Sequence, residues 1–233
     1  MKKIYVILFT GFLSFGLIAQ PVAKVGLNMS TLISKDAQYE NSTYNAGYFG
    51  SVGYKINMGD VMSFTPGLAY SVRGAASEYD LSFYDPFLGT LLYTYTYTMK
   101  SNIHYLEVPL DFAFNINESI GIIVSPYYGM KLGETMSVEY EDENGNTQEL
   151  TVDASLGEDD AYSNSDFGIG LGVSYVINDN LMADARFTMG LMNINGAEEI
   201  ADDPSTTTID ESFEPDPIKN IGIMIGVGYA IGN

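Results

Sequence analysis

A strict two-residue alternation runs through this chain and limits its fold more than any other feature. In the stretch DFGIGLGVSYVI, residues 166–177, small or polar residues take every second position and large apolar residues take the positions between. Side chains of a β-strand point alternately to its two faces, so the pattern predicts a strand with one small-residue face and one apolar face. Glycine weakens a strand interior because it offers no side chain to pack. Its repeated use on one face therefore needs a reason in the tertiary structure.

The same period recurs often enough to predict eight strands. They cover residues 23–30, 44–56, 62–74, 107–114, 120–133, 166–177, 181–191 and 220–231. Three connections are short, at residues 57–61, 115–119 and 178–180. Four are long, at residues 31–43, 74–101, 134–164 and 193–217. Short turns that alternate with long loops are typical of an antiparallel up-and-down barrel with two unlike ends. An even number of strands places both termini at the short-turn end.

Two classes of barrel fit this alternation, and they differ in which face is inside. A soluble lipocalin-like ligand-binding barrel turns its apolar face inward, whereas a transmembrane barrel turns it outward to lipid. The polar face carries five basic and four acidic side chains, in a chain whose net charge is −20. These are Lys24, Lys55, Arg73, Glu107, Asp111, Lys131, Asp166, Asp184 and Arg186. Nearly equal numbers of basic and acidic side chains on this face favour an enclosed lumen, in which buried charges pair with one another.

The size of such a lumen explains the glycines. Eight strands enclose an interior just wide enough for side chains to fill. Large inward side chains such as Phe49 and Tyr127 therefore need Gly or Ser opposite them. We predict an all-β fold, an eight-stranded antiparallel up-and-down transmembrane β-barrel with a side-chain-filled lumen. The soluble lipocalin-like barrel stays the alternative.

The first twenty residues predict export. Lys2 and Lys3 precede an apolar run from Ile4 to Ile18, and the small residue Ala19 follows. This is the layout of a cleaved signal peptide. We therefore expect residues 1–20 to be removed and residues 21–233 to form a barrel domain in the outer membrane of a Gram-negative bacterium. The chain has no cysteine, so its exported fold forms without disulfides.

Three prolines conflict with a closed barrel. Pro66, Pro109 and Pro126 fall inside predicted strands, where each removes a hydrogen-bond donor from a ladder. We expect bulges at these positions or a place near a rim. A change of phase between the tyrosines of LLYTYTYTM, residues 91–99, and the strand at 107–114 predicts a further bulge near residues 101–105.

The predicted long loops are acidic. Residues 134–163 contain ten acidic residues and residues 193–217 contain eight, both without a Lys or Arg. Asn144-Gly145 predicts a hairpin turn in the first of these regions. Such external loops could bind divalent cations, attract a basic partner, or simply form a solvated surface. The stretch EDENGN lacks the spacing of a calcium loop, and the negative charge disfavours nucleic acid.

Catalysis has little support in the sequence. The only histidine is His104, for which Ser101 or Glu107 would be the candidate partners. A single histidine without a spacing motif is more often structural. We therefore assign no catalytic residue, no metal ligand and no cofactor, and expect a structural or binding protein rather than an enzyme.

Several segments, taken in order, also match a known family. They are GLNMS (26–30), FTPGLAYSVRGA (64–75), YLEVPLDFAF (105–114), SPYYGMKLG (125–133), DFGIGLGVSYVI (166–177) and ARFTMGLMNI (185–194). The chain resembles the PorT-like outer-membrane β-barrel family of Bacteroidota. The resemblance implies an eight-stranded outer-membrane barrel and does not fix a function. A role as an accessory component of a protein secretion or envelope complex is therefore a second hypothesis.

Overall fold

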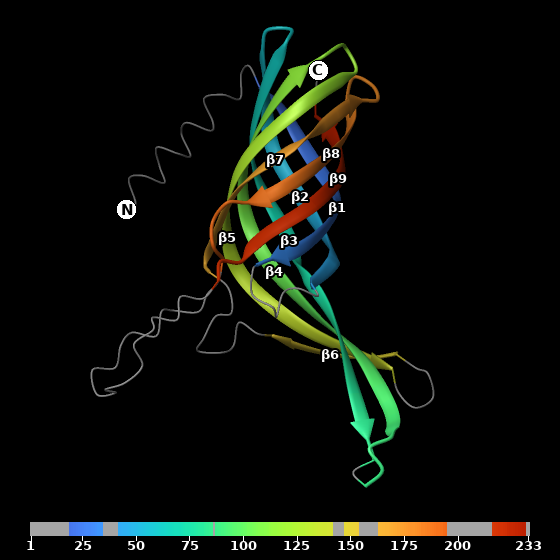
Figure 1. The fold of residues 1–233 in the computed structure, drawn as a ribbon. Helices are drawn as coiled ribbons and strands as arrows, with labels where there is room; N and C mark the ends of the chain where they lie inside the picture. Colours follow the sequence, from blue (N-terminus) through green and yellow to red (C-terminus); the bar gives the residue numbers. More distant parts are fainter. Residues whose placement is uncertain are drawn as a thin grey trace, which may run out of the picture.

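The chain forms a closed β-barrel (Figure 1). The computed structural model describes residues 19–34, 42–85, 87–141, 147–153, 163–194 and 216–231. Its strands are β1 (Gln20–Ile33), β2 (Ser42–Met58), β3 (Met62–Tyr84), β4 (Leu91–Asn115), β5 (Ile120–Glu141), β6 (Thr147–Asp153), β7 (Ser165–Val176), β8 (Leu181–Gly190) and β9 (Lys219–Ala230). The order β4-β3-β2-β1-β9-β8-β7-β5 closes through β4–β5 pairing, and β6 lies outside this ring. The predicted eight-stranded antiparallel barrel is confirmed.

The apolar face of the strands points outward. On β1, Val25, Leu27 and Met29 are 60%, 70% and 53% exposed, whereas Asn28 and Ser30, on the other face, are buried. The same outward row of large apolar side chains continues on the other strands of the ring. A soluble barrel would expose the polar face instead, so the lipocalin-like alternative is wrong. Among the described residues, no helix is long and apolar enough to span a membrane.

The short turns share one end of the barrel with both ends of the described chain. Asn117 and Asn178 each begin a turn, and the side-chain oxygen of each accepts hydrogen bonds from two backbone N–H groups two and three residues later. This local bonding is why asparagine favours turns. At the same end, the backbone N–H of Ile231 donates to the carbonyl of Pro21 at 2.7 Å.

At the other end, β3 and β4 continue far past the ring (Figure 1). β4 stays paired with β5 up to Tyr97↔Tyr140, and beyond this pair β3 and β4 project as a two-stranded ribbon. The predicted long loop at 74–101 is therefore mostly strand, and the connection is reduced to residues 85–90. The tip is held by Asp85, whose carboxylate accepts the backbone N–H groups of Phe87 and Leu88 at 2.8 Å. These two hydrogen bonds, that from Leu88 first, hold the pKa of Asp85 below its usual value.

The predicted hairpin in the acidic region is also present. β5 continues to Glu141 and pairs with β6, from Thr135↔Asp153 to Glu141↔Thr147. The turn itself, with Asn144-Gly145 and most of EDENGN, lies outside the described residues. So do the acidic stretches at 154–162 and 195–215.

The prolines are accommodated without bulges, so the first of the two expected solutions is wrong. Pro66 interrupts the β2–β3 ladder, Pro109 the β3–β4 ladder and Pro126 the β4–β5 ladder. On both sides of each gap the register is the same, as with Gly53↔Gly67 and Ile56↔Phe64 around the first. Each proline therefore interrupts the backbone pairing with one of the two neighbouring strands. The side chains of its strand continue to alternate between the lumen and the outer face.

Candidate functional site: the barrel lumen and its external mouth

Near the short turns, the lumen holds a compact group of charges, called here the turn-side cluster. Asp111 on β4 is its centre, with Lys24 on β1 at 2.8 Å and a double hydrogen bond from Arg186 on β8 at 2.9 and 3.2 Å. Asp184 accepts from Arg186 Nε at 3.0 Å and lies 3.4 Å from Lys24 Nζ. Ser125 on β5 also donates to Asp111, at 2.6 Å.

This cluster is electrically neutral and almost entirely buried. Its two basic and two acidic side chains are each no more than 11% exposed. Buried charges are tolerated when geometry and additional hydrogen bonds satisfy them, and removal of one partner is strongly destabilising. The cluster joins strands from opposite parts of the ring, and it therefore acts as a polar core for the barrel.

Further from the short turns lies the loop-side cluster, centred on Arg73 of β3. Its guanidinium group pairs with Glu107 at 2.9 Å, donates to the Tyr127 hydroxyl at 2.8 Å and lies 4.4 Å from the centre of the Tyr127 ring. The Tyr127 hydroxyl donates to Asp166 at 3.2 Å, and Asn220 of β9 donates to the same carboxylate oxygen at 3.1 Å. The cluster thus connects β3, β4, β5, β7 and β9.

Two predicted lumen residues lie outside these clusters. Lys55 lines a cavity at the short-turn end. Lys131 forms an ion pair with Glu134 at 3.3 Å, and both side chains are buried. The sequence had placed Glu134 in an acidic external loop, which is wrong. Between His104↔Gly133 and Tyr105↔Lys131 the β4–β5 register shifts by one residue, leaving Leu132 as an extra residue on β5.

That bulge changes which residues of β5 face inward. Before it, the odd-numbered residues to Lys131 face the lumen; after it, Glu134 is also buried inside. The predicted bulge near residues 101–105 therefore exists, but its extra residue is on β5 and not on β4. β4 keeps one register with β3 from Phe83↔Tyr93 to Met62↔Phe114.

The glycines make room for the large lumen side chains. The ring of Phe49 lies against Gly26 and Gly226, where a Cβ atom would come within 3 Å of it. A Cβ on Gly168 would overlap the hydroxyl of Tyr127, and one on Gly172 would overlap Arg186. The alternation of glycine with apolar residues thus follows from a narrow, filled lumen.

This packing predicts a specific coupling between Gly226 and Phe49. Gly226→Ala is expected to destabilise the barrel by about 1–3 kcal/mol, because its methyl group overlaps the Phe49 ring. Combined with Phe49→Ala, the overlap disappears, so the double variant is expected to lose at least about 1 kcal/mol less than the sum. Urea unfolding in lipid vesicles measures all three. Gly50→Ala is the control, since a Cβ there meets no atom within 4 Å; simple additivity would contradict the prediction.

The remaining space in the lumen is small. One cavity of about 30 Å³ lies between the two clusters, and another of about 50 Å³ lies near Lys55. One water molecule needs about 10–15 Å³ of such space, so each of these cavities holds no more than a few waters.

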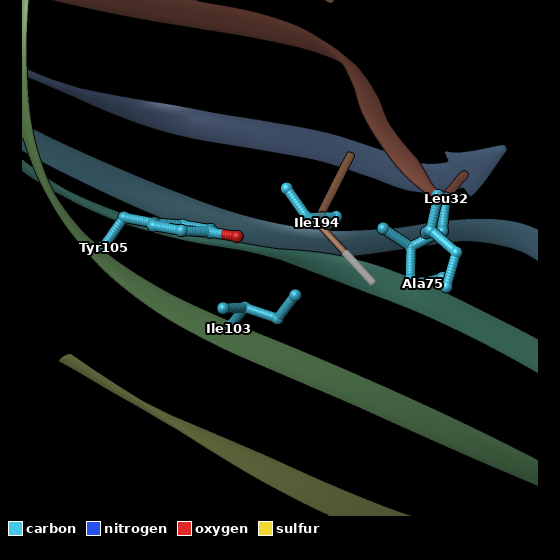
Figure 2. Close-up of a cluster of buried hydrophobic side chains, with 6 residues drawn as sticks. Leu32, Ala75, Ile103, Tyr105 and Ile194 are labelled. Atoms are coloured by element: carbon cyan, nitrogen blue, oxygen red, sulfur yellow. The ribbon is translucent and has the colours of Figure 1, made fainter. Parts of the chain in front are cut away.

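Above the loop-side cluster, an apolar group closes the lumen (Figure 2). This apolar cap consists of Leu32, Ala75, Ile103, Tyr105, Ile194 and Ile218. Ile103 and Ile194 are completely buried, at 0% exposure. Figure 2 shows side chains from β1, β3 and β4 converging on Ile194, with Tyr105 extending toward it.

Backbone hydrogen bonds hold the cap in place. The N–H of Ser163 donates to the carbonyl of Ile194, and the N–H of Ile194 donates to that of Ile218, at 2.8 and 2.9 Å. The side chain of Asn193 accepts the N–H of Ile218 at 2.9 Å. Sequence reasoning missed the cap. Ile103 and Tyr105 are separated from the lumen residue Glu107 by even numbers of residues, and this spacing could have placed them in the lumen. Ile194 and Ile218 flank a long connection, and no alternation in the sequence around them predicts their position.

The histidine does not meet its proposed catalytic partners. His104 lies on the outer face of β4, where its Nδ1 and the Tyr70 hydroxyl are 2.6 Å apart. Glu107 lies in the lumen, paired with Arg73. Two residues of a strand that are an odd number of positions apart point to opposite faces. Ser101 and His104 are three positions apart, so they also lie on opposite faces of β4. Among the described residues, no group of acidic or histidine side chains is arranged to hold a metal ion.

Comparison with known proteins identifies the family. The family described as "Outer membrane protein beta-barrel domain" matches residues 19–196, which is more than half of the chain. The chain belongs to this family. As a member of it, the protein is an outer-membrane β-barrel that crosses the lipid bilayer with its strands. No curated protein matches the sequence.

Several solved outer-membrane barrels are similar in fold. Ail of Yersinia pestis has 13% identity and a TM-score of 0.43, with 91% of this chain and 99% of Ail covered. Neisserial surface protein A has 10% identity and a TM-score of 0.41, with coverages of 90% and 96%. The outer membrane protease OmpT of Escherichia coli has 8% identity and a TM-score of 0.38, with coverages of 91% and 97%. Similarity at this level carries no information on the function of this chain.

Proposed function

We propose that this protein is a non-catalytic anchor that presents binding surfaces outside the cell. The observation that carries the proposal is the contrast between the two parts of the molecule. The lumen is filled by two charged clusters and closed by the apolar cap, whereas the β3–β4 ribbon projects past the ring with large side chains exposed. At the ribbon tip, Phe87 is 94% exposed. Exposed apolar groups gathered in one place are typical of interaction surfaces.

A filled lumen predicts that the protein does not conduct ions. In planar lipid bilayers, the purified barrel is expected to give no discrete conductance steps, because its cavities hold only a few waters. Ile103→Ala is expected to behave in the same way, since both charged clusters still fill the lumen below the cap. Regular single-channel steps from the wild-type protein would contradict a purely anchoring role.

The binding role is tested by capture. The full chain in mild detergent, with a mobility shift on boiling as proof of folding, is incubated with surface proteins and medium of the source cells. We expect a retained component that is lost when the ribbon is shortened by joining Glu78 to its partner Thr98 through a two-residue turn. Equal capture by the shortened chain would contradict the role of the ribbon.

We infer further that the chain is a PorT-like member of its family, and that its partner belongs to a secretion or envelope complex. The motifs from 64–75 and 105–114 support the first inference. Co-purification from native envelopes tests the second: a stoichiometric envelope partner supports it, and isolation of the barrel alone contradicts it. The acidic residues in the sequence between 134 and 163 and between 193 and 217 favour a basic or cation-bridged partner.

Export by a cleaved signal peptide is also a proposal. Residues 1–18 lie outside the described residues, and Gln20 already pairs with Lys55 in β1. Intact-mass measurement of the native protein is expected to show a chain that begins at Pro21, because the basic and apolar segment has been removed. A mass that includes Met1 would contradict it.

A further inference from the structure

The projecting ribbon has two unlike faces. On one face, Tyr79 stacks on Tyr97 with ring centres 5.4 Å apart, and Phe83 meets Tyr95 edge to face at 6.1 Å. Leu81 lies between them, directly opposite Tyr95, and is half exposed. These side chains form a continuous apolar surface outside the ring. Beyond the Tyr97↔Tyr140 pair, β3 and β4 have no further strand beside them among the described residues, and two strands bury little of such a surface by themselves.

The opposite face of the ribbon is polar and acidic. Thr96 donates to Asp80 at 2.6 Å, and the hydroxyls of Ser82 and Thr94 are 3.0 Å apart. Glu78 lies opposite Thr98 on the same face. From residue 77 to residue 99 the chain has three acidic residues and no basic one. The ribbon thus combines an apolar face with a negative one.

One edge of this ribbon lacks a neighbouring strand among the described residues. The β2–β3 ladder ends at Ser42↔Ser77, so the edge formed by Glu78 to Ser82 extends beyond Ser42, the first residue of β2. An open strand edge presents unpaired N–H and C=O groups and is a template for an added strand. A strand added here would continue the row that β2 occupies in the ring.

The charges of this edge determine what kind of strand can be added. A second copy of the chain would bring Glu78 and Asp80 against the same two carboxylates, and like charges opposite each other on paired strands are destabilising. An incoming strand with Lys or Arg at alternate positions would instead place opposite charges beside them. Its intervening apolar side chains would reach Tyr79 and Leu81.

From this combination we propose that the Glu78–Ser82 edge of β3 binds an extended, basic polypeptide by strand addition. The bound segment alternates Lys or Arg with apolar residues, places its cations beside Glu78 and Asp80, and packs its apolar side chains on the Tyr79–Leu81 surface. This inference rests on the proposed binding role of the ribbon, and it names the chemistry of the partner.

The probe is a synthetic peptide of about seven residues, the length of an average strand or slightly more, alternating Lys and Val. N-methylation of alternate residues along one of its edges prevents the peptide from stacking on itself and leaves the other edge able to pair. Binding to the full chain in lipid nanodiscs is measured by fluorescence anisotropy. We expect saturable binding, and none when both edges are N-methylated or when Glu replaces Lys.

Charge reversal in the protein supplies the decisive comparison. The variant Glu78→Lys with Asp80→Lys is expected to bind the Lys–Val peptide at least about tenfold more weakly and to gain binding of the Glu–Val peptide. Glu118→Lys, an exposed change at the short-turn end, is the matched control and is expected to bind like the wild type. The mobility shift on boiling verifies that each variant is folded.

The outcomes separate this inference from the proposed function. Unchanged peptide binding in the charge-reversed variant overturns the inference, and so does equal binding of the doubly N-methylated peptide. Equal binding by protein-free nanodiscs would show that the peptide recognises lipid and overturns it as well. The wild-type chain and the charge-reversed variant are also compared in the capture experiment. If both retain the same cell-surface partner equally well, the binding role of the ribbon stands and the proposed chemistry of the partner is wrong.

Discussion

Replacement of Asp111 by Ala is expected to destabilise the folded barrel by about 3–5 kcal/mol. This carboxylate accepts hydrogen bonds from Lys24, Ser125 and both terminal nitrogens of Arg186. Without it, two cations share a buried space with Asp184 alone, and one positive charge has no counter-charge within the cluster. The loss is measured as a lower urea midpoint of the barrel in lipid vesicles, followed by its mobility on unboiled gels.

Two further variants identify the cause of this loss. Asp111→Asn keeps hydrogen-bonding atoms but not the charge, and is expected to be less stable than the wild type and more stable than Asp111→Ala. Asp179→Ala removes an exposed carboxylate from a short turn and is expected to change stability by no more than about 0.5 kcal/mol. If Asp111→Ala were as stable as Asp179→Ala, the turn-side cluster would not be a polar core.

Substitution of Leu27 by Arg is expected to cost about 2–4 kcal/mol in a lipid bilayer. Leu27 lies in the middle of β1, opposite Tyr48 on β2 and Ile225 on β9, and its side chain points away from the lumen. A guanidinium group at this place has hydrocarbon around it and no counter-charge. The effect is measured by unfolding in vesicles and is expected to be smaller in detergent micelles, which admit more water.

The matched control for this substitution lies outside the membrane. Phe87→Arg introduces the same charge at the exposed tip of the ribbon and is expected to leave barrel stability unchanged within about 0.5 kcal/mol. Leu27→Arg with wild-type stability in a bilayer would mean that this face of β1 does not meet lipid. That result would contradict the outward orientation of the apolar side chains.

The fold was predictable because the period of two acts within each strand. Val25, Leu27 and Met29 share a face whatever the neighbouring strands do, and so the outward apolar row follows from the sequence. The unlike ends follow from turn chemistry and connection lengths, which are also local. The prolines were misjudged because a missing donor was expected to bend the strand, whereas Pro66, Pro109 and Pro126 each leave a gap in one ladder and keep the register.

Contacts between strands were beyond such reasoning. Two examples are the contact of Arg73 with the ring of Tyr127 and the ion pairs that Asp111 forms with Lys24 and Arg186. Both depend on how far neighbouring strands are shifted along one another. Alternation within one strand gives no measure of that shift. The alternation of LLYTYTYTM, residues 91–99, is visible in the sequence, but the apolar face and open edge of the ribbon are visible only when β3 and β4 are paired.

By itself, the sequence determined the number of strands in the ring, the outward apolar face, the small residues of the lumen and the difference between the two ends. These follow from the alternation of side chains along a strand and from the conformational preferences of turns. Only the tertiary structure decided which charges meet, that an extra residue at Leu132 leaves Glu134 inside, and that six apolar residues close the mouth. These depend on register and on residues distant in sequence, because barrel closure sets the positions of all strands together.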